Sequence, residues 1–176
     1  KYAVSGTGLI GLSSGPIRAF VRTRDGLDAP NAMIMWLPFL IGEQMTSLEK
    51  ESGVSAAAHA LRPESTGSVH ITSNDGAAAP AIRFNFLSAA LDREITLDVA
   101  KLLREIMKAP ALADIVDGEL APGPGVVSDD EIMDWARMAG ATCFHPVGTC
   151  KMGSDPMAVV DERLRVHGIS GLRVAD

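Results

Sequence analysis

The side chain best suited to acid–base chemistry is His145, in residues 143–153, which we call the histidine loop. Pro146 follows the histidine, and a residue before proline is pushed out of the helical region into extended backbone. Gly148 permits a turn that a residue with a Cβ disfavours. A neutral imidazole can accept a proton near pH 7. The loop therefore indicates a histidine presented as a general base, although a histidine hydrogen-bonded within a turn would give the same pattern.

The two cysteines of the chain, Cys143 and Cys150, flank the same histidine. Together with His145 they would supply three metal ligands, but their spacing fits no common zinc pattern. We therefore predict no metal site and a pair of reduced thiols packed in the core. The two cysteines form no disulfide framework, which is typical of a reducing compartment and predicts a cytoplasmic protein.

The other three histidines are predicted to have no catalytic role. His70 falls on the polar face of an alternating segment, and His59 lies in a stretch of serine and alanine without a partner nearby in the sequence. His167 precedes a glycine, and we expect it to be structural.

The composition is that of a globular chain with its own core. The 176 residues are 47% hydrophobic and 22% charged, and a folded chain of this length buries roughly 70% of its unfolded surface. The net charge of −6, with no run of basic residues, argues against a nucleic-acid-binding face. No stretch reaches the roughly 18 apolar residues of a membrane-spanning helix, so we predict no membrane span.

Two helices are predicted upstream of the histidine loop. Apolar residues at helical spacing predict the first helix over 91–108, with polar residues that include Asp92 on its outer face. Ser128 and Glu131 form the sequence pattern of a capping box, which predicts the second helix over 129–139. This second helix leads directly into the histidine loop.

Strands are predicted where apolar and polar residues alternate, or where an apolar run is bounded by turn residues. The expected strands are 17–23, 32–37, 68–72 and 81–86, and residues 42–60 are expected to form a loop. Together with the helices they predict an α+β fold, in which one antiparallel sheet carries both helices on one side.

Residues 6–11 match the Gly-x-Gly-x-x-Gly pattern of dinucleotide-binding sites. Such a site needs a strand before the glycines and a helix that opens on them. Five residues before Gly6 are too few for a buried strand, and Gly15 and Pro16 interrupt any helix that would follow. We therefore interpret this segment as a glycine-rich loop.

Three other segments accompany the histidine loop at characteristic spacing: 61–69, with the pattern Arg-Pro-x-Ser-x-Gly-x-Val, then 160–168 and 171–176. With these segments, the chain resembles the C-terminal part of the glucose–methanol–choline (GMC) oxidoreductases, and in particular their choline- and alcohol-dehydrogenase-like members. The resemblance covers essentially the whole chain, and the combined spacing is far more specific than any one motif.

The resemblance implies an enzyme that binds FAD and oxidises a primary alcohol, choline-like or other. His145 matches the family's catalytic histidine, which takes the hydroxyl proton while a hydride passes to the flavin N5. Phe144 lies at a position that often lines the substrate pocket. Asp176 matches an acidic residue that contacts the cofactor region.

The resemblance also implies a division of the chain. Residues 1–153 would form the substrate-binding domain, and residues 154–176 would return to an FAD-binding, Rossmann-like domain that the sequence does not contain. The family's second catalytic residue, a histidine or asparagine, lies beyond residue 176. We therefore expect the chain alone to bind no FAD and to be inactive, and its uncovered strand edge to favour a homo-oligomer or strand exchange.

Two alternatives to alcohol oxidation stay open. Some relatives of this architecture cleave cyanohydrins and use the flavin structurally, so the chain would be part of a lyase. A standalone binding domain without catalysis is the second alternative.

Overall fold

The computed structural model describes residues 2–8, 11–13, 15–42 and 47–175 of the chain. These residues divide into two compact units. Unit 1 comprises Lys1–Thr66 and Asn85–Ala141, and unit 2 comprises Gly67–Phe84 and Thr142–Asp176.

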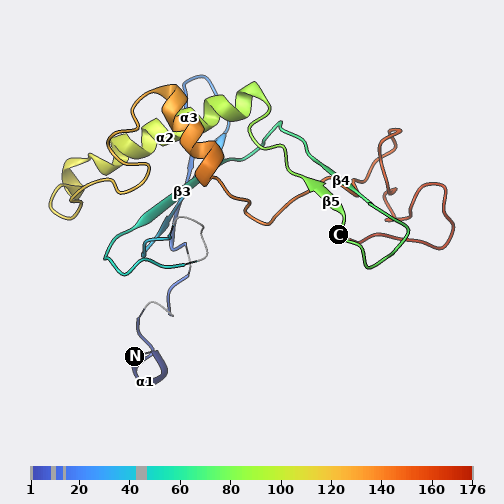
Figure 1. The fold of residues 1–176 in the computed structure, drawn as a ribbon, viewed down its shortest axis with the longest axis horizontal. Helices are drawn as coiled ribbons and strands as arrows, with labels where there is room; N and C mark the ends of the chain where they lie inside the picture. Colours follow the sequence, from blue (N-terminus) through green and yellow to red (C-terminus); the bar gives the residue numbers. More distant parts are fainter. Residues whose placement is uncertain (1, 9–10, 14, 43–46, 176) are drawn as a thin grey trace. The chain divides into compact units, whose positions relative to one another are not determined.

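The sheet of unit 1 has three antiparallel strands, β1 (Ile17–Val21), β2 (Ala32–Leu37) and β3 (Ser55–Ala60), in that spatial order (Figure 1). The central strand β2 confirms the strand predicted from its apolar run. Ala32 and Ile34 are completely buried, and Met33 and Met35 on the other face are half-buried. Two hydrogen-bonded neighbours therefore hold a strand whose side chains are shielded on both faces.

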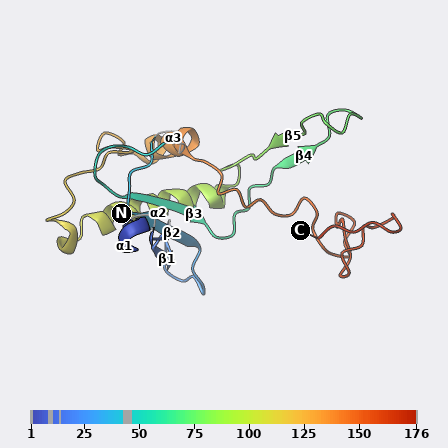
Figure 2. The same cartoon turned by 90° about the horizontal axis from the view of Figure 1, so that it is seen from below.

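Helix α2 (Ala90–Met107) lies across this sheet and supplies the other half of the core (Figures 1 and 2). Its Ile95 and Val99 are 3% and 2% exposed and pack with Ala32 and Ile34 of β2. Full burial of an isoleucine or valine side chain contributes roughly 1.5–3 kcal/mol. The apolar stripe predicted for this helix is therefore confirmed as the face that holds it on the sheet.

Helix α3 (Asp129–Ala139) packs against α2 through the buried Ile132 and Met133. The predicted capping box is present: the Ser128 hydroxyl accepts from the Glu131 N–H at 3.3 Å, and the Glu131 carboxylate accepts from the Ser128 N–H at 2.8 Å. Lys101 of α2 forms an ion pair with Asp129 at 2.6 Å. A short 3-10 helix, η2 (Pro110–Leu112), follows α2.

Two features of the predicted sheet are wrong. Residues 55–60, expected to be part of a loop, form the strand β3, which pairs with β2 along its whole length. Its sequence, Ser-Ala-Ala-Ala-His-Ala, lacks the β-branched and aromatic residues that signal a strand. Small side chains are nevertheless suited to a strand that lies close beneath a helix, as β3 lies beneath α2.

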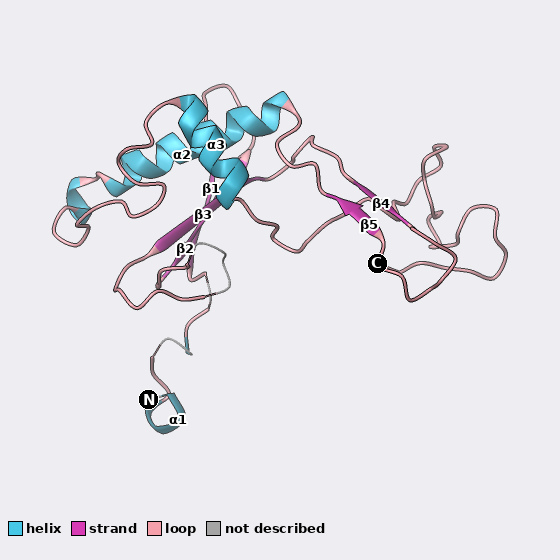
Figure 3. Cartoon of the chain, viewed as in Figure 1, coloured by secondary structure: helices cyan, strands magenta, loops and turns pink. Residues whose placement is uncertain are grey.

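The second error concerns the partners of the two later strands. Strands β4 (Ser68–His70) and β5 (Ala81–Arg83) belong to unit 2 and form a two-stranded hairpin of their own, not an extension of the first sheet (Figure 3). The predicted antiparallel pairing is confirmed, with Val69 opposite Ile82. A Cβ at Gly67 would collide with the Arg83 carbonyl oxygen, so glycine permits the close approach at this end of the hairpin.

The remainder of unit 2 is a series of turns around Val160, which is 2% exposed. Val160 bridges to Met152 and to Val166 through backbone pairs, and the Gly153 N–H donates to the Val160 carbonyl oxygen at 3.0 Å. Arg165 bridges to Arg173. Short backbone bridges therefore give residues 151–174 a defined path with few regular elements.

Helix α1 (Tyr2–Ser5) precedes the glycine-rich segment. Gly6 thus follows a helical turn and not a strand, in agreement with the interpretation of this segment as a loop; residues 9, 10 and 14 lie outside the described residues. Among the helices that the structure describes, none has the length and apolar content needed to cross a bilayer.

Candidate functional site

The backbone of the histidine loop turns on both sides of His145. Phe144 has a left-handed φ of 60°, and its N–H donates to Thr142 Oγ1 at 3.0 Å. Gly148 has a φ of 97°. Left-handed backbone costs a residue with a Cβ roughly 1–2 kcal/mol, which glycine does not incur. The Thr142 hydroxyl therefore supports the turn at Phe144, and the glycine itself permits the turn that follows.

The side chains at the centre of this loop face solvent. Phe144 is 82% exposed and Val147 is 93% exposed, and His145 is also exposed. Within the described part of the chain, the His145 imidazole makes no hydrogen bond and no ion pair. Its ring nitrogens are therefore available to a bound molecule, between apolar side chains of the kind that mark ligand or protein contacts.

The other histidines lie in settings that fit the roles expected for them. His59 is half-buried on β3, and burial lowers its pKa. His70 ends β4 with an exposed side chain. His167 Nε2 lies 3.0 Å from the Gly153 carbonyl oxygen, and its backbone N–H donates to the Val159 carbonyl oxygen. His167 is thus a structural residue that ties the end of the histidine loop to a later turn.

The two cysteines are free thiols, but the prediction that they pack in the core is wrong. Cys143 is exposed and Cys150 is half-buried. The side chains of residues 143–149 are exposed, so the loop offers no packed interior to either thiol. No group of three metal-ligating side chains occurs among the described residues.

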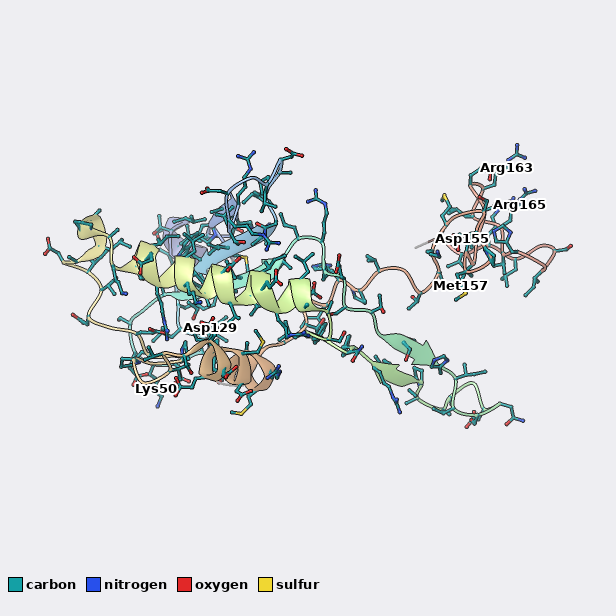
Figure 4. The ribbon with its side chains drawn as sticks, turned by 90° about the horizontal axis from the view of Figure 1, so that it is seen from above. Lys50, Asp129, Asp155, Met157, Arg163 and Arg165 are labelled. Atoms are coloured by element: carbon teal, nitrogen blue, oxygen red, sulfur yellow. The ribbon has the colours of Figure 1, made fainter. Side chains whose placement is uncertain are left out.

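The C-terminal end of the histidine loop is anchored at Lys151. Its carbonyl oxygen accepts from the Val159 N–H at 2.9 Å, and its Nζ forms an ion pair with Asp155 at 2.9 Å. Asp155 Oδ1 also accepts from the Met157 N–H at 2.9 Å, which closes the intervening turn (Figure 4). The hydrogen bond from Lys151 to Asp155 is the main cause that lowers the pKa of Asp155.

Asp161 organises the next turn. Its Oδ1 accepts from the N–H groups of Arg163 and Arg165 at 2.9 and 3.0 Å, and its Oδ2 accepts from Arg165 Nε at 2.8 Å. The Arg165 side chain is the main cause that lowers the pKa of Asp161 to about 2, and the backbone hydrogen bonds lower it further. An ionised Asp161 thus holds residues 161–165, where Arg163 and Arg165 lie in Figure 4.

Asp176, the residue expected to contact the cofactor region, lies outside the described residues. Of the three residues assigned roles from the resemblance, His145 and Phe144 are adjacent in the same exposed loop. The catalytic role of His145 and the substrate contact of Phe144 stay predictions, because they concern contacts with bound molecules.

A residue that the sequence did not single out holds the Arg-Pro-x-Ser-x-Gly-x-Val segment in place. Asp92, expected on the outer face of α2, is 4% exposed. Its two carboxylate oxygens accept from the N–H groups of Glu64 and Ser65, each at 2.8 Å. The Ser65 hydroxyl in turn accepts from the Ala89 N–H at 3.0 Å, just before α2.

The charge state of Asp92 follows from these contacts. Burial alone would raise the pKa of Asp92, but hydrogen bonds from Ser65 and Glu64, with the nearby charge of Arg93, together lower it. The buried carboxylate is therefore ionised at neutral pH and satisfied by backbone donors. An acidic residue in the first turn of a helix is the sequence signal that favours such a role.

Comparisons with known proteins extend this picture. The chain is 37% identical over its whole length to an oxygen-dependent choline dehydrogenase of Chromohalobacter salexigens, and the match covers 32% of that protein. Among solved structures, pyridoxine 4-oxidase from Mesorbium loti matches with a TM-score of 0.75 and 28% identity, over 90% of this chain and 32% of the other.

A structure of formate oxidase from Aspergillus oryzae, which concerns modification of its FAD, matches with a TM-score of 0.74 and 26% identity, over 99% of this chain and 29% of the other. The chain thus spans about a third of the length of the curated relative it matches. The family model described as GMC oxidoreductase matches residues 63–176. These residues include the hairpin, α2, α3 and the histidine loop, and the chain belongs to the GMC oxidoreductase family.

Proposed function

We propose that this chain is the substrate-binding part of an FAD-dependent oxidoreductase that oxidises a primary alcohol of the choline type. The observation that carries the proposal is the exposed, unpaired His145 in a loop whose backbone is fixed on both sides. The similarity of the whole chain to an oxygen-dependent choline dehydrogenase supports this choice of substrate class.

The residues around His145 fit the redox end of FAD. Phe144 and Val147 offer exposed apolar surface, and no acidic residue occurs between 142 and 150. Such a surface suits a flat aromatic ring system that gains electrons during the reaction. The glycines after α1 do not suit the pyrophosphate, because the described residues directly before them form a short helix, whereas such a site needs a strand there. We expect Asp176 to contribute to the cofactor contact, as the family resemblance implies.

In the proposed reaction, an unprotonated ring nitrogen of His145 accepts the hydroxyl proton of the alcohol. The imidazolium that results lies next to the developing alkoxide and stabilises its charge. Phe144 covers the substrate and limits the access of water. Bound FAD supplies the acceptor for the hydride that leaves the alcohol carbon. A positioned base of this kind contributes roughly 10²–10⁴-fold to the rate.

The exposed apolar side chains of the hairpin in unit 2 are suited to a contact with another domain. Val69 and Ile82, paired across the hairpin, are 48% and 54% exposed, and Ile71 is 89% exposed. An isolated two-stranded hairpin is marginally stable in water. We propose that residues 1–153 bind substrate and that 154–176 return to an FAD-binding domain, which also covers the hairpin. Strand exchange between copies is the alternative cover.

The test is anaerobic reduction of flavin in the full-length protein. Addition of choline should bleach the absorbance of the oxidised flavin, whereas the chain alone should give no such signal because it is expected to bind no FAD. A full-length protein that binds no FAD would contradict the proposal. Cleavage of a cyanohydrin without any flavin reduction by alcohols would instead establish the lyase alternative.

A further inference from the structure

Unit 1 contains a pocket of about 200 Å³ that the proposed reaction does not use. It lies between the β1–β2 connection, the segment after β3 and the first turns of α2. Its lining residues are Arg24, Leu27, Asn31, Arg62, Leu91 and Ile95. At about 30 Å³ per water molecule, this volume corresponds to roughly seven waters, which is the size of a small organic molecule.

The pocket combines an apolar floor with two cationic side chains. Ile95 is 3% exposed, and Leu27 and Leu91 are half-buried. The floor therefore favours an aliphatic group over water. Arg24 and Arg62 are both exposed, so their guanidinium groups are open to a ligand at the rim.

Both guanidinium groups retain unused donors. Arg24 donates from Nη1 to Glu94 Oε2 at 3.0 Å, and Arg62 donates from Nη1 to the Pro30 carbonyl oxygen at 3.3 Å. Within the described residues, these are the hydrogen bonds of the two side chains. Each guanidinium carries five N–H donors, so several of them remain for a ligand.

The local charge favours an anion with a single charge. Glu94 forms an ion pair with Arg24, and both side chains are about half exposed. Arg62 forms no ion pair among the described residues. The two arginines and Glu94 together therefore leave one net positive charge at the rim. Asn31 contributes a neutral part of the pocket wall. Its Oδ1 accepts from the Thr23 N–H, and its Nδ2 donates to Thr23 Oγ1.

We infer that this pocket binds a small monocarboxylate with an aliphatic body. The carboxylate binds between Arg62 and Arg24, where an arginine fork gives paired, charge-assisted hydrogen bonds. The aliphatic part covers Leu27, Leu91 and Ile95. Hexanoate, with eight non-hydrogen atoms, is the probe whose size and polarity match these features.

The experiment is calorimetric titration of hexanoate into the full-length protein and its variants, with hexanol as the neutral probe of matched length. Wild-type protein should bind hexanoate saturably in the millimolar range and hexanol more weakly. Arg62→Gln should weaken the binding of hexanoate at least about tenfold. Arg22→Gln removes an arginine outside the pocket, whose bond is to the Asp28 carbonyl oxygen, and should leave the binding unchanged.

Glu94→Gln supplies a test in the opposite direction. It releases Arg24 from its ion pair and should tighten the binding of hexanoate by about two- to fivefold. Equal binding by all variants, or equal binding of hexanol and hexanoate, would overturn the inference. Absence of measurable binding to wild-type protein would do the same. If Arg62→Gln fails to fold, Arg24→Gln replaces it and should weaken the binding in the same direction.

Discussion

Replacement of Asp92 by alanine is predicted to destabilise unit 1 severely. The carboxylate accepts two backbone N–H groups at 2.8 Å each and is 4% exposed. A buried donor left without a partner costs about 1–3 kcal/mol. The N–H groups of Glu64 and Ser65 are only partly buried, so the lower half of that range applies to each. The expected loss of unfolding free energy is therefore about 2–4 kcal/mol.

The variant Asp92→Asn keeps the size and shape of the side chain but removes its negative charge. Asp92→Asn keeps one oxygen acceptor but turns an amide N–H group toward the other backbone donor, so we expect roughly half of the alanine effect. Glu105→Ala is the matched control on the same helix. Glu105 is 73% exposed and forms its ion pair with the exposed Lys108, so its loss should cost less than about 0.5 kcal/mol.

Urea denaturation, followed by far-UV circular dichroism, measures these differences as shifts of the midpoint at constant slope. Hydrogen exchange at the Glu64 and Ser65 amides gives a local measurement at the same site, and both amides should lose protection in Asp92→Ala. An unfolding midpoint for Asp92→Ala equal to that of Glu105→Ala would refute the conclusion that Asp92 stabilises the segment that contains Glu64 and Ser65.

The same carboxylate predicts a dependence on pH. The pKa of Asp92 is lowered in the folded chain, so its stabilising contribution is fully present above the unfolded pKa of about 3.9 and is lost as the pH falls through the folded value. The stability advantage of wild type over Asp92→Asn should therefore shrink below about pH 4. An advantage that is constant from neutral to acidic pH would contradict this reasoning.

Three further predictions concern local structure. Ser128→Ala removes the cap of α3 and should reduce the unfolding free energy by about 0.5–2 kcal/mol, measured by urea denaturation. Gly67→Ala places a Cβ against the Arg83 carbonyl oxygen and should disrupt the hairpin, which would appear as faster exchange of the hairpin amides. Asp161→Asn removes a carboxylate whose pKa is lowered to about 2 in the folded chain. Its contribution is present above about pH 4 and is lost toward pH 2. The melting temperatures of wild type and Asp161→Asn should therefore converge as the pH falls from about 4 to about 2. A difference in melting temperature that stays constant over this pH range would contradict the stabilising role of the bonds between Asp161 and Arg165.

The sequence predicts most of the regular elements because their signals are local. The apolar stripe of α2, the capping box of α3 and the apolar run of β2 each depend on residues within one segment. The strand β3 is not predictable in this way because it is built of alanines, and its pairing with β2 is a tertiary effect. The alternation of apolar and polar residues marks β4 and β5 as strands, but it does not tell which sheet they join.

In the candidate site, too, the features that depend on neighbouring residues are predictable and those that depend on distant residues are not. The proline and glycine of the histidine loop predict a shaped loop that presents His145, and the structure turns the backbone at Phe144 and at Gly148. Asp92 was expected on the outer face of its helix because its partners, Glu64 and Ser65, lie 28 and 27 residues away in the sequence. The anchoring of Lys151 and Gly153 by the later turns is likewise non-local.

The most direct test of the proposal that His145 is the base is flavin reduction in His145→Ala of the full-length protein. Stopped-flow measurement with choline under anaerobic conditions gives the rate of hydride transfer. His70→Ala, another exposed histidine, is the matched control. The proposal predicts a loss of roughly 10²–10⁴-fold in His145→Ala, with flavin still bound, and an unchanged rate in His70→Ala. Equal reduction rates in the two variants would contradict it.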